Sequence, residues 1–248
     1  AENSGTTVTL TATSSQVADE DVTVTLSTSG TATNGTDYSA FDSQTITIAA
    51  GSTTGTITGT PTDDSIYEGD EVATIAISTV SGGGATESGA QSVSITITEN
   101  ESAPTITLAT STSSLAENSG TTVTLTATSS QVADEDVTVT LSTSGTATNG
   151  TDYSAFDSQT ITIAAGSTTG TITGTPTDDS IYEGDEVATI AISTVSGGGA
   201  TESGAQSVSI TITENESAPT ITLATSTSSV AENSGTTVTL TATSSQVA

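Results

Sequence analysis

Four side-chain types that most proteins use are missing from this sequence: lysine, arginine, histidine and cysteine. Without His or Cys, the nucleophile–base pairs of Ser-His-Asp and Cys-His enzymes cannot be built, and zinc sites made of these residues are excluded. Without Lys or Arg, no basic patch can hold nucleic acid or an anionic membrane surface. Disulfides and lysine isopeptide bonds are likewise excluded as covalent braces of the fold.

Aromatic residues and long apolar runs are also scarce. The chain has no Trp, two Phe and four Tyr. A pair of carboxylates can catalyse glycoside hydrolysis, but such sites need a cleft that is usually lined by aromatic side chains. We therefore expect that this protein is not an enzyme. No apolar run approaches the roughly 18 residues of a transmembrane helix, so we expect no membrane span in this segment.

Acidic residues, in contrast, number 29 and give a formal charge of -29. They are densest at 63–71, where five of nine residues are carboxylates, and the stretch recurs unchanged at 178–186. Like charges this close repel one another, unless a cation or water relieves the repulsion. Closely spaced hard oxygen ligands suit calcium, so the stretch is either half of a calcium site or a solvated acidic turn.

The sequence is an internal repeat with a period of 115 residues: 1–115 and 116–230 differ only at Leu115 and Val230, and 231–248 start a third copy. This period is the size of a whole domain. We place the boundaries within the Pro-containing links, so that the strand after each proline belongs to the following repeat. Residues 1–102 then form a repeat that lacks its first strand, 103–218 a complete repeat, and 219–248 the opening strands of a third.

Alternation of apolar and threonine residues with a period of two predicts strands throughout each repeat. In the first repeat and the link that follows it, the predicted strands are 7–13, 21–26, 44–48, 55–58, 73–77, 92–98 and 105–108. Seven short strands with one apolar face each predict two packed antiparallel sheets. The fold class is therefore an all-β chain of tandem immunoglobulin-like β-sandwiches.

Three segments in fixed order, Gly30–Tyr38, Ala50–Ile57 and Asp63–Glu71, resemble the Calx-β domain, a calcium-binding module that occurs in tandem in large bacterial surface and secreted proteins. The resemblance covers the whole repeat and implies an immunoglobulin-like sandwich with Ca²⁺ at one end. The ligands it implies are Glu2, Asp37, Asp63, Asp64, Glu68, Glu99 and Glu101, and in the second repeat Glu117, Asp152, Asp178, Asp179, Glu183, Glu214 and Glu216. Glu99-Asn100-Glu101 departs from the run of aspartates that calcium-binding members carry there.

Several of these residues have a structural alternative. Asp37 can accept backbone N–H groups within its own turn. Asp70 and Glu71 can simply begin the next strand, and Asp19–Asp21 reads as a solvated acidic loop.

We expect a stiff extracellular or cell-surface rod of identical repeats, either the stalk of a surface adhesin or a stretch of a biofilm fibre, with neighbouring chains as further partners. The alternative is a calcium-dependent module that binds a glycan or a protein. The ends of the sequence leave two explanations open. The segment is part of a longer repetitive polymer, which we favour, or neighbouring chains donate the missing strands.

Overall fold

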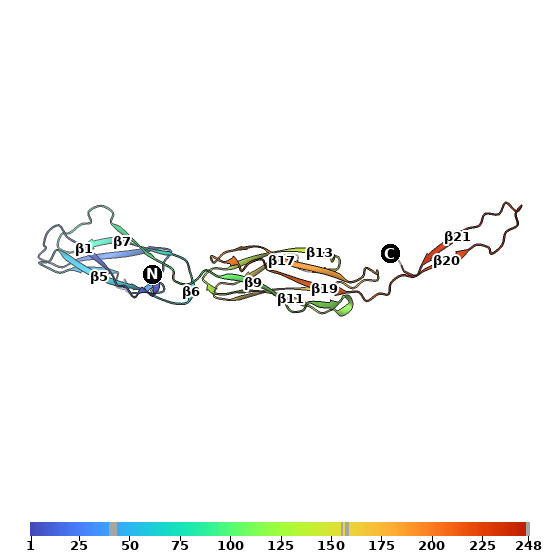
Figure 1. The fold of residues 1–248 in the computed structure, drawn as a ribbon. Helices are drawn as coiled ribbons and strands as arrows, with labels where there is room; N and C mark the ends of the chain where they lie inside the picture. The colour runs from blue at the N-terminus through green and yellow to red at the C-terminus, as the bar shows by residue number, and fades with distance from the viewer. Residues whose placement is uncertain (40–43, 155, 157–158, 247–248) are drawn as a thin grey trace. The chain divides into compact units, whose positions relative to one another are not determined.

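The computed structural model describes residues 1–39, 44–154, 156 and 159–246, and these residues form two compact units (Figure 1). Unit 1 comprises Ala1–Pro104 with Gln131–Glu135, and unit 2 comprises Thr105–Ser130 with Asp136–Ala248. Both units consist of β-strands, as predicted. The repeat boundaries after residues 102 and 218 stay predictions.

Unit 2 contains two five-stranded sheets. The first has the order β10 (Ser114–Ala116), β19 (Ser207–Thr213), β17 (Glu186–Ser196), β13 (Val137–Gly145) and β15 (Thr160–Ile163). The second has the order β14 (Tyr153–Ser154), β16 (Thr169–Pro176), β11 (Val123–Ser129), β9 (Thr105–Thr110) and β18 (Thr201–Glu202). The predicted sandwich is confirmed. Two short edge pairings, β10 with β19 and β9 with β18, are parallel where antiparallel strands were expected.

The core of unit 2 lies between these sheets and follows the predicted alternation. In β11, Val123, Leu125 and Ala127 are buried, whereas the intervening Thr124 and Thr126 are only half-buried. The same inward rows come from β13 and β17, and Tyr153 packs against Phe156 with ring centroids 5.7 Å apart. The core is thus aliphatic with a small aromatic end.

Unit 1 has the same arrangement with fewer strands. One sheet has the order β4 (Thr45–Ile48), β2 (Val22–Gly30), β7 (Glu71–Ser81) and β8 (Ser92–Ile97), and the other β1 (Val8–Thr13), β5 (Thr54–Pro61) and β3 (Tyr38–Ser39). The short β6 (Ile66–Tyr67) pairs in parallel with β12 (Val132–Ala133). In the part of unit 1 that the structure describes, no strand pairs with the second edge of β1, whereas the same edge of β11 holds β9.

Threonines face each other across the outer surface of the strand pairs. Thr9 lies opposite Thr58 and Thr11 opposite Thr56, and the second repeat places Thr124 opposite Thr173 in the same way. Such β-branched polar pairs stabilise antiparallel strands and keep the outer face wettable.

Two 3-10 helices and one two-stranded hairpin complete the described structure. The 3-10 helices η1 (Glu2–Ser4) and η2 (Glu117–Ser119) each end at a glycine in the left-handed region. The strands β20 (Ile221–Thr225) and β21 (Leu240–Ser244) form a two-stranded hairpin. Among the described helices, none has the length and apolar character needed to cross a membrane.

Candidate metal centre

The site is organised around Glu99, which follows β8. The carboxylate oxygen Oε2 of Glu99 accepts hydrogen bonds from the backbone N–H groups of Glu68 (2.7 Å) and Gly69 (2.8 Å). Gly69 has a φ of 78°, in the left-handed region that glycine adopts without strain, and this lets successive N–H groups face one anion. The other oxygen, Oε1, accepts from the N–H groups of Asn100 and Glu101. The acidic loop is thereby tied to the end of β8.

These four donors keep Glu99 ionised. Burial works against ionisation, but the backbone hydrogen bonds from Glu101, Glu68 and Gly69 outweigh it and lower the pKa of Glu99 to about 2. In the second repeat the corresponding N–H groups lower the pKa of Glu214 to about 2. Glu99 and Glu214 therefore carry permanent negative charges at neutral pH.

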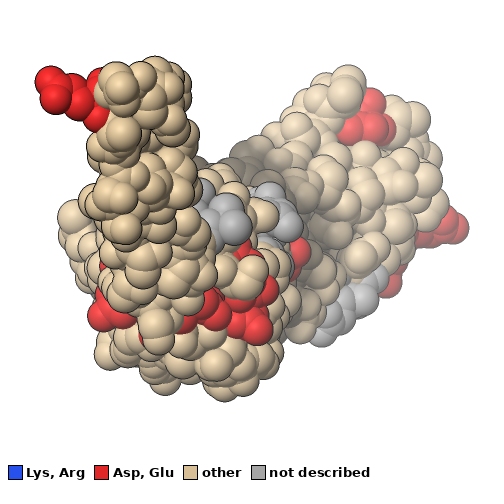
Figure 2. All heavy atoms as spheres, turned by 90° about the vertical axis from the view of Figure 1, so that its right-hand side faces the viewer, with Lys and Arg blue, Asp and Glu red and all other residues tan. Residues whose placement is uncertain are grey.

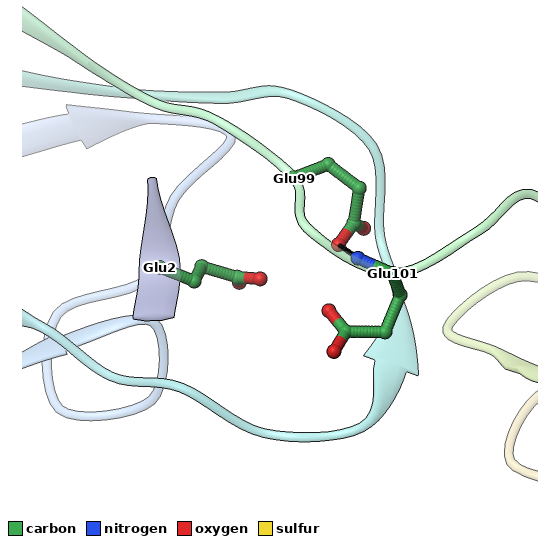
Figure 3. A group of neighbouring side chains, drawn as sticks. All are labelled: Glu2, Glu99 and Glu101. Atoms are coloured by element: carbon green, nitrogen blue, oxygen red, sulfur yellow. Dashed lines mark hydrogen bonds between the residues drawn. The ribbon is translucent and has the colours of Figure 1, made fainter. Parts of the chain in front are cut away.

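Cluster A consists of Glu2, Glu99 and Glu101, each of which offers one carboxylate oxygen within 4.8 Å of the others (Figure 3). Glu2 lies on η1, where its backbone N–H donates to the carbonyl oxygen of Thr98. Its side chain is 4% exposed and points toward that of Glu101. Burial and the charges of Glu99 and Glu68 raise the pKa of Glu2 to about 7. In cluster A, the buried side chain of Glu2 therefore lies close to the carboxylate of Glu99, which stays ionised.

Cluster B consists of Asp37, Glu68 and Glu71, again with three carboxylate oxygens within 4.8 Å of one another. Asp37 is buried, and its Oδ2 accepts the backbone N–H of Thr33 in its own turn, as the structural alternative predicts. Burial and the neighbouring Asp37 raise the pKa values of Glu68 and of Glu71 to about 7. Asp37 therefore both caps its turn and faces two acids.

The second repeat builds both clusters again. Glu117, Glu214 and Glu216 form cluster A, and Asp152, Glu183 and Glu186 form cluster B. A third group joins the two clusters there, consisting of Glu117, Asp179 and Glu183. The residues of the two repeats are identical at these positions, and both repeats form clusters A and B.

The structure brings together most of the predicted ligands, but not all. Asp63 and Asp178 belong to no three-acid group among the described residues, and Asp64 joins none in unit 1. The side-chain oxygen of Asp63 instead lies 3.4 Å from the Asn100 amide nitrogen, and Asp64 accepts the N–H of Ile66. Whether any of these residues binds a metal stays a prediction.

Glu71 and its counterpart Glu186 are members of cluster B, and neither was among the ligands expected from the sequence. The sequence placed Glu71 at the start of a strand, and both residues do begin their strands, β7 and β17. The alternation of residues along the strand could have shown that Glu71 lies on its inward face. Glu71 shares its face with Ala73 and Ile75, which point into the core, and a carboxylate in such a row needs a partner.

The clusters have the donor set that a hard divalent cation requires. Oε2 of Glu2, Glu68, Glu71 and Glu101 are each buried and accept no hydrogen bond from the described residues. Buried, unpartnered carboxylate oxygens are costly, and no side chain of this protein can neutralise them. A calcium ion bound by several of these oxygens would remove both penalties. The residues therefore fit Ca²⁺.

The comparison with known families agrees with this geometry. The model of the Calx-beta domain matches twice in tandem, at residues 1–101 and 99–216. The chain belongs to the Calx-beta domain family. This confirms the resemblance drawn from the sequence and the immunoglobulin-like sandwich that it implied. No curated protein sequence matches the chain.

The search of solved structures found matches that include Calx CBD domains. The tandem domains CBD12 from CALX1.2 are 16% identical, and the match covers 86% of this chain and 95% of that chain with a TM-score of 0.36. The apo-form Calx CBD1 domain is 18% identical over 46% of this chain and 99% of that chain, with a TM-score of 0.35. Invasin, a bacterial integrin-binding protein, is 17% identical over 96% of this chain and 43% of its own, with a TM-score of 0.34.

Proposed function

We propose that this Calx-beta protein is a calcium-binding structural repeat of a stiff extracellular rod, without catalytic activity of its own. The observation that carries the proposal is the pair of acidic clusters at the strand ends of each repeat, with buried carboxylate oxygens that accept no hydrogen bond from the described residues. Calcium bound at these clusters would replace the repulsion between their carboxylates at this end of the sandwich by attraction of each carboxylate to the ion.

The location of cluster A favours a structural role for the ion. Glu99 and Glu101 immediately precede the link Ser102-Ala103-Pro104, which leads into the strand β9 of the second repeat. A short link that contains Pro is stiffer than a flexible coil. An ion held by Glu2, Glu99 and Glu101 would fasten the chain just before this link. Repeats fastened at each link would make a rod, either the stalk of a surface adhesin or a stretch of a fibre.

The composition supports an exterior location. Figure 2 shows acidic side chains on the protein surface with no Lys or Arg among them, in keeping with the formal charge of -29. Extracellular calcium modules bind at about 10⁻⁴ to 10⁻³ M, which matches the calcium concentration outside cells rather than inside them. The alternative, a calcium-dependent module for a glycan or a partner protein, stays a prediction.

Thermal unfolding in calcium and in chelator tests the proposal. At a calcium concentration of about 100 times Kd, one site stabilises the folded state by about 2.7 kcal/mol, so Tm rises by several degrees. The variant Glu2→Gln with Glu117→Gln should lose most of this rise. Glu20→Gln with Glu135→Gln is the matched control, because it removes the same charges from positions outside the clusters and should keep the response.

Magnesium at the same ionic strength separates binding from screening. Mg²⁺ requires a small octahedral site and retains its water, so its effect should be clearly smaller than that of Ca²⁺. Equal Tm in calcium, magnesium and chelator would exclude the clusters as a calcium site.

The rod itself is tested by small-angle scattering, in which calcium should stiffen the link. Identical scattering in calcium and chelator would contradict the structural role of the ion, but it would not contradict calcium binding.

A further inference from the structure

The carboxylate of Glu99 has no acceptor position left for a metal ion. An ionised carboxylate offers about four lone-pair positions, two on each oxygen. Oε2 of Glu99 accepts the backbone N–H groups of Glu68 at 2.7 Å and Gly69 at 2.8 Å. Its Oε1 accepts those of Asn100 at 2.8 Å and Glu101 at 2.9 Å. Backbone donors therefore occupy every position at which this carboxylate could bind an ion.

The second repeat shows the same arrangement at Glu214. Oε2 of Glu214 accepts the N–H groups of Glu183 at 2.6 Å and Gly184 at 2.8 Å. Its Oε1 accepts those of Asn215 and Glu216, both at 2.9 Å. The saturation of this carboxylate by backbone N–H groups is therefore a property of both repeats.

The acidic loop also binds the end of the preceding strand from its own side. Oδ1 of Asp70 accepts the backbone N–H of Glu99 at 3.0 Å, and Oδ1 of Asp185 accepts that of Glu214 at the same distance. Glu99 thus joins the loop to the end of β8 through its carboxylate and through its own N–H. None of these bonds requires a cation, because each joins a carboxylate to a backbone N–H group.

Two other carboxylate oxygens of cluster A are available to an ion. Oε2 of Glu2 and Oε2 of Glu101 are buried and accept no hydrogen bond from the described residues, and the Glu2 side chain is 4% exposed. In Figure 3 the side chains of Glu2 and Glu101 point toward each other, whereas the carboxylate of Glu99 turns to the backbone N–H of Glu101. Oε2 of Glu216 is available in the same way in the second repeat.

We propose that Glu99 and Glu214 do not touch the calcium ion but hold the acidic loop in position for it. The direct ligands of cluster A are then Glu2 and Glu101, and Glu99 attracts the ion only through its charge. The inference rests on the proposed calcium binding and narrows its ligand set. It departs from the resemblance to the Calx-β domain, which implied that Glu99 and Glu214 are ligands themselves.

The length of the Glu99 side chain suits this positioning role. Glutamate has one methylene group more than the aspartate that calcium-binding members carry here, so its carboxylate extends further from the end of β8. It meets the loop where Gly69, with a φ of 78°, turns two successive N–H groups toward it. A calcium ion therefore finds the loop already formed, and binding does not have to supply the conformational entropy of ordering it.

Amide hydrogen exchange in chelator tests whether these carboxylates hold the loop. In the unmodified full chain, the loop N–H groups bonded to Glu99 and Glu214 should be protected. Glu99→Gln with Glu214→Gln should accelerate their exchange at least about tenfold, because an amide offers only one acceptor oxygen. The matched control, Glu101→Gln with Glu216→Gln, removes the same charge two residues further on and should keep the protection.

A second variant covers the case in which the amide variant is unstable in chelator. Glu99→Asp with Glu214→Asp keeps both charges and shortens both side chains, so it should accelerate exchange of the same loop N–H groups. Slow exchange at Ile75 and Ile190, which are buried in the central strands β7 and β17, shows that the fold is intact in each sample.

Equilibrium dialysis at saturating calcium tests the ligand assignment, under conditions in which the ion itself stabilises the fold. Glu99→Gln with Glu214→Gln should bind as many calcium ions per chain as the unmodified protein, with an affinity lower by about tenfold because a nearby charge is lost. Glu101→Gln with Glu216→Gln removes a direct ligand from each repeat and should bind fewer ions.

Two outcomes would overturn the inference. Equal loss of bound calcium in the Glu99→Gln and Glu101→Gln variants would make Glu99 a direct ligand. Unchanged protection of the loop N–H groups in both Glu99 variants would show that this side chain does not hold the loop. If the unmodified chain binds no calcium, the proposed function and the ligand assignment both fail, and the exchange measurement alone decides whether Glu99 holds the loop.

Discussion

Without calcium, raising the pH from about 4.5 to about 7.5 should destabilise this protein. The carboxyl groups of Glu2, Glu68 and Glu71 have their pKa raised from 4.5 to about 7, with burial as the main cause. Between these two values the folded state holds protons that the unfolded chain has released, so the free energy of unfolding falls as pH rises. This stability is fully present below about pH 4.5 and is lost as pH rises through about 7.

The magnitude follows from the size of the pKa difference. A raise from 4.5 to about 7 corresponds to about 3 kcal/mol for one isolated group, at 1.36 kcal/mol for each factor of ten in proton affinity. The clusters are partly open to water and their members share protons, so the groups do not contribute independently. We therefore expect a loss of about 1–2 kcal/mol for each cluster.

Urea unfolding in chelator at about pH 4.5, 6 and 7.5 measures this slope. The variant Glu71→Gln with Glu186→Gln should flatten it, because both groups have a pKa raised to about 7. Glu20→Gln with Glu135→Gln removes the same formal charge and should leave most of the slope. Saturating calcium should reverse the sign, since the ion binds deprotonated carboxylates. Stability in chelator that rises steadily across this range would refute the reasoning.

Three substitutions and one control substitution test other parts of the structure by urea unfolding. Glu99→Gln should lower the stability of unit 1 by about 2–3 kcal/mol, because an amide cannot accept all four backbone N–H groups; no loss would mean that these bonds do not hold the loop. Gly145→Ala should cost about 3 kcal/mol or more, since its Cβ would lie 2.0 Å from the carbonyl oxygen of Val187, whereas Gly150→Ala meets open space and should cost about 1 kcal/mol. Leu125→Ala should cost about 2–5 kcal/mol as a fully buried leucine, and a smaller loss would indicate a loosely packed core.

Most of the fold could be predicted from the sequence because each strand has one apolar face. Val22, Val24 and Leu26 were expected to share the inner face of a strand, and all three are buried. The two-residue strands and the parallel edge pairings were not predicted. Elements such as β18 are too short to show a period, and their pairing depends on where the neighbouring turn ends.

The candidate site was predictable in outline but not in its membership. Local density of acids identified the loop at 63–71, yet it could not show which acids point inward. Asp63 is exposed, whereas Glu71 lies close to Asp37 in space although the two residues are far apart in the sequence. The role of Glu99 as an acceptor for four N–H groups depends on the left-handed turn at Gly69, which becomes visible only in three dimensions.

The rows of paired threonines also determine where the charge of this protein lies. Among the described residues, only Glu71, Glu186 and Glu202 place a carboxylate within a strand; the other acids occupy loops and the short helices η1 and η2. The outer faces of the sheets are therefore electrically neutral and rich in hydroxyl groups. Dissolved salt acts on these two regions differently, because it screens repulsion at the loops and leaves the hydroxyl rows unaffected. Two such faces can approach each other without bringing carboxylates together. Repulsion between two copies of the protein therefore comes from the acidic loops, and its dependence on ionic strength is set there.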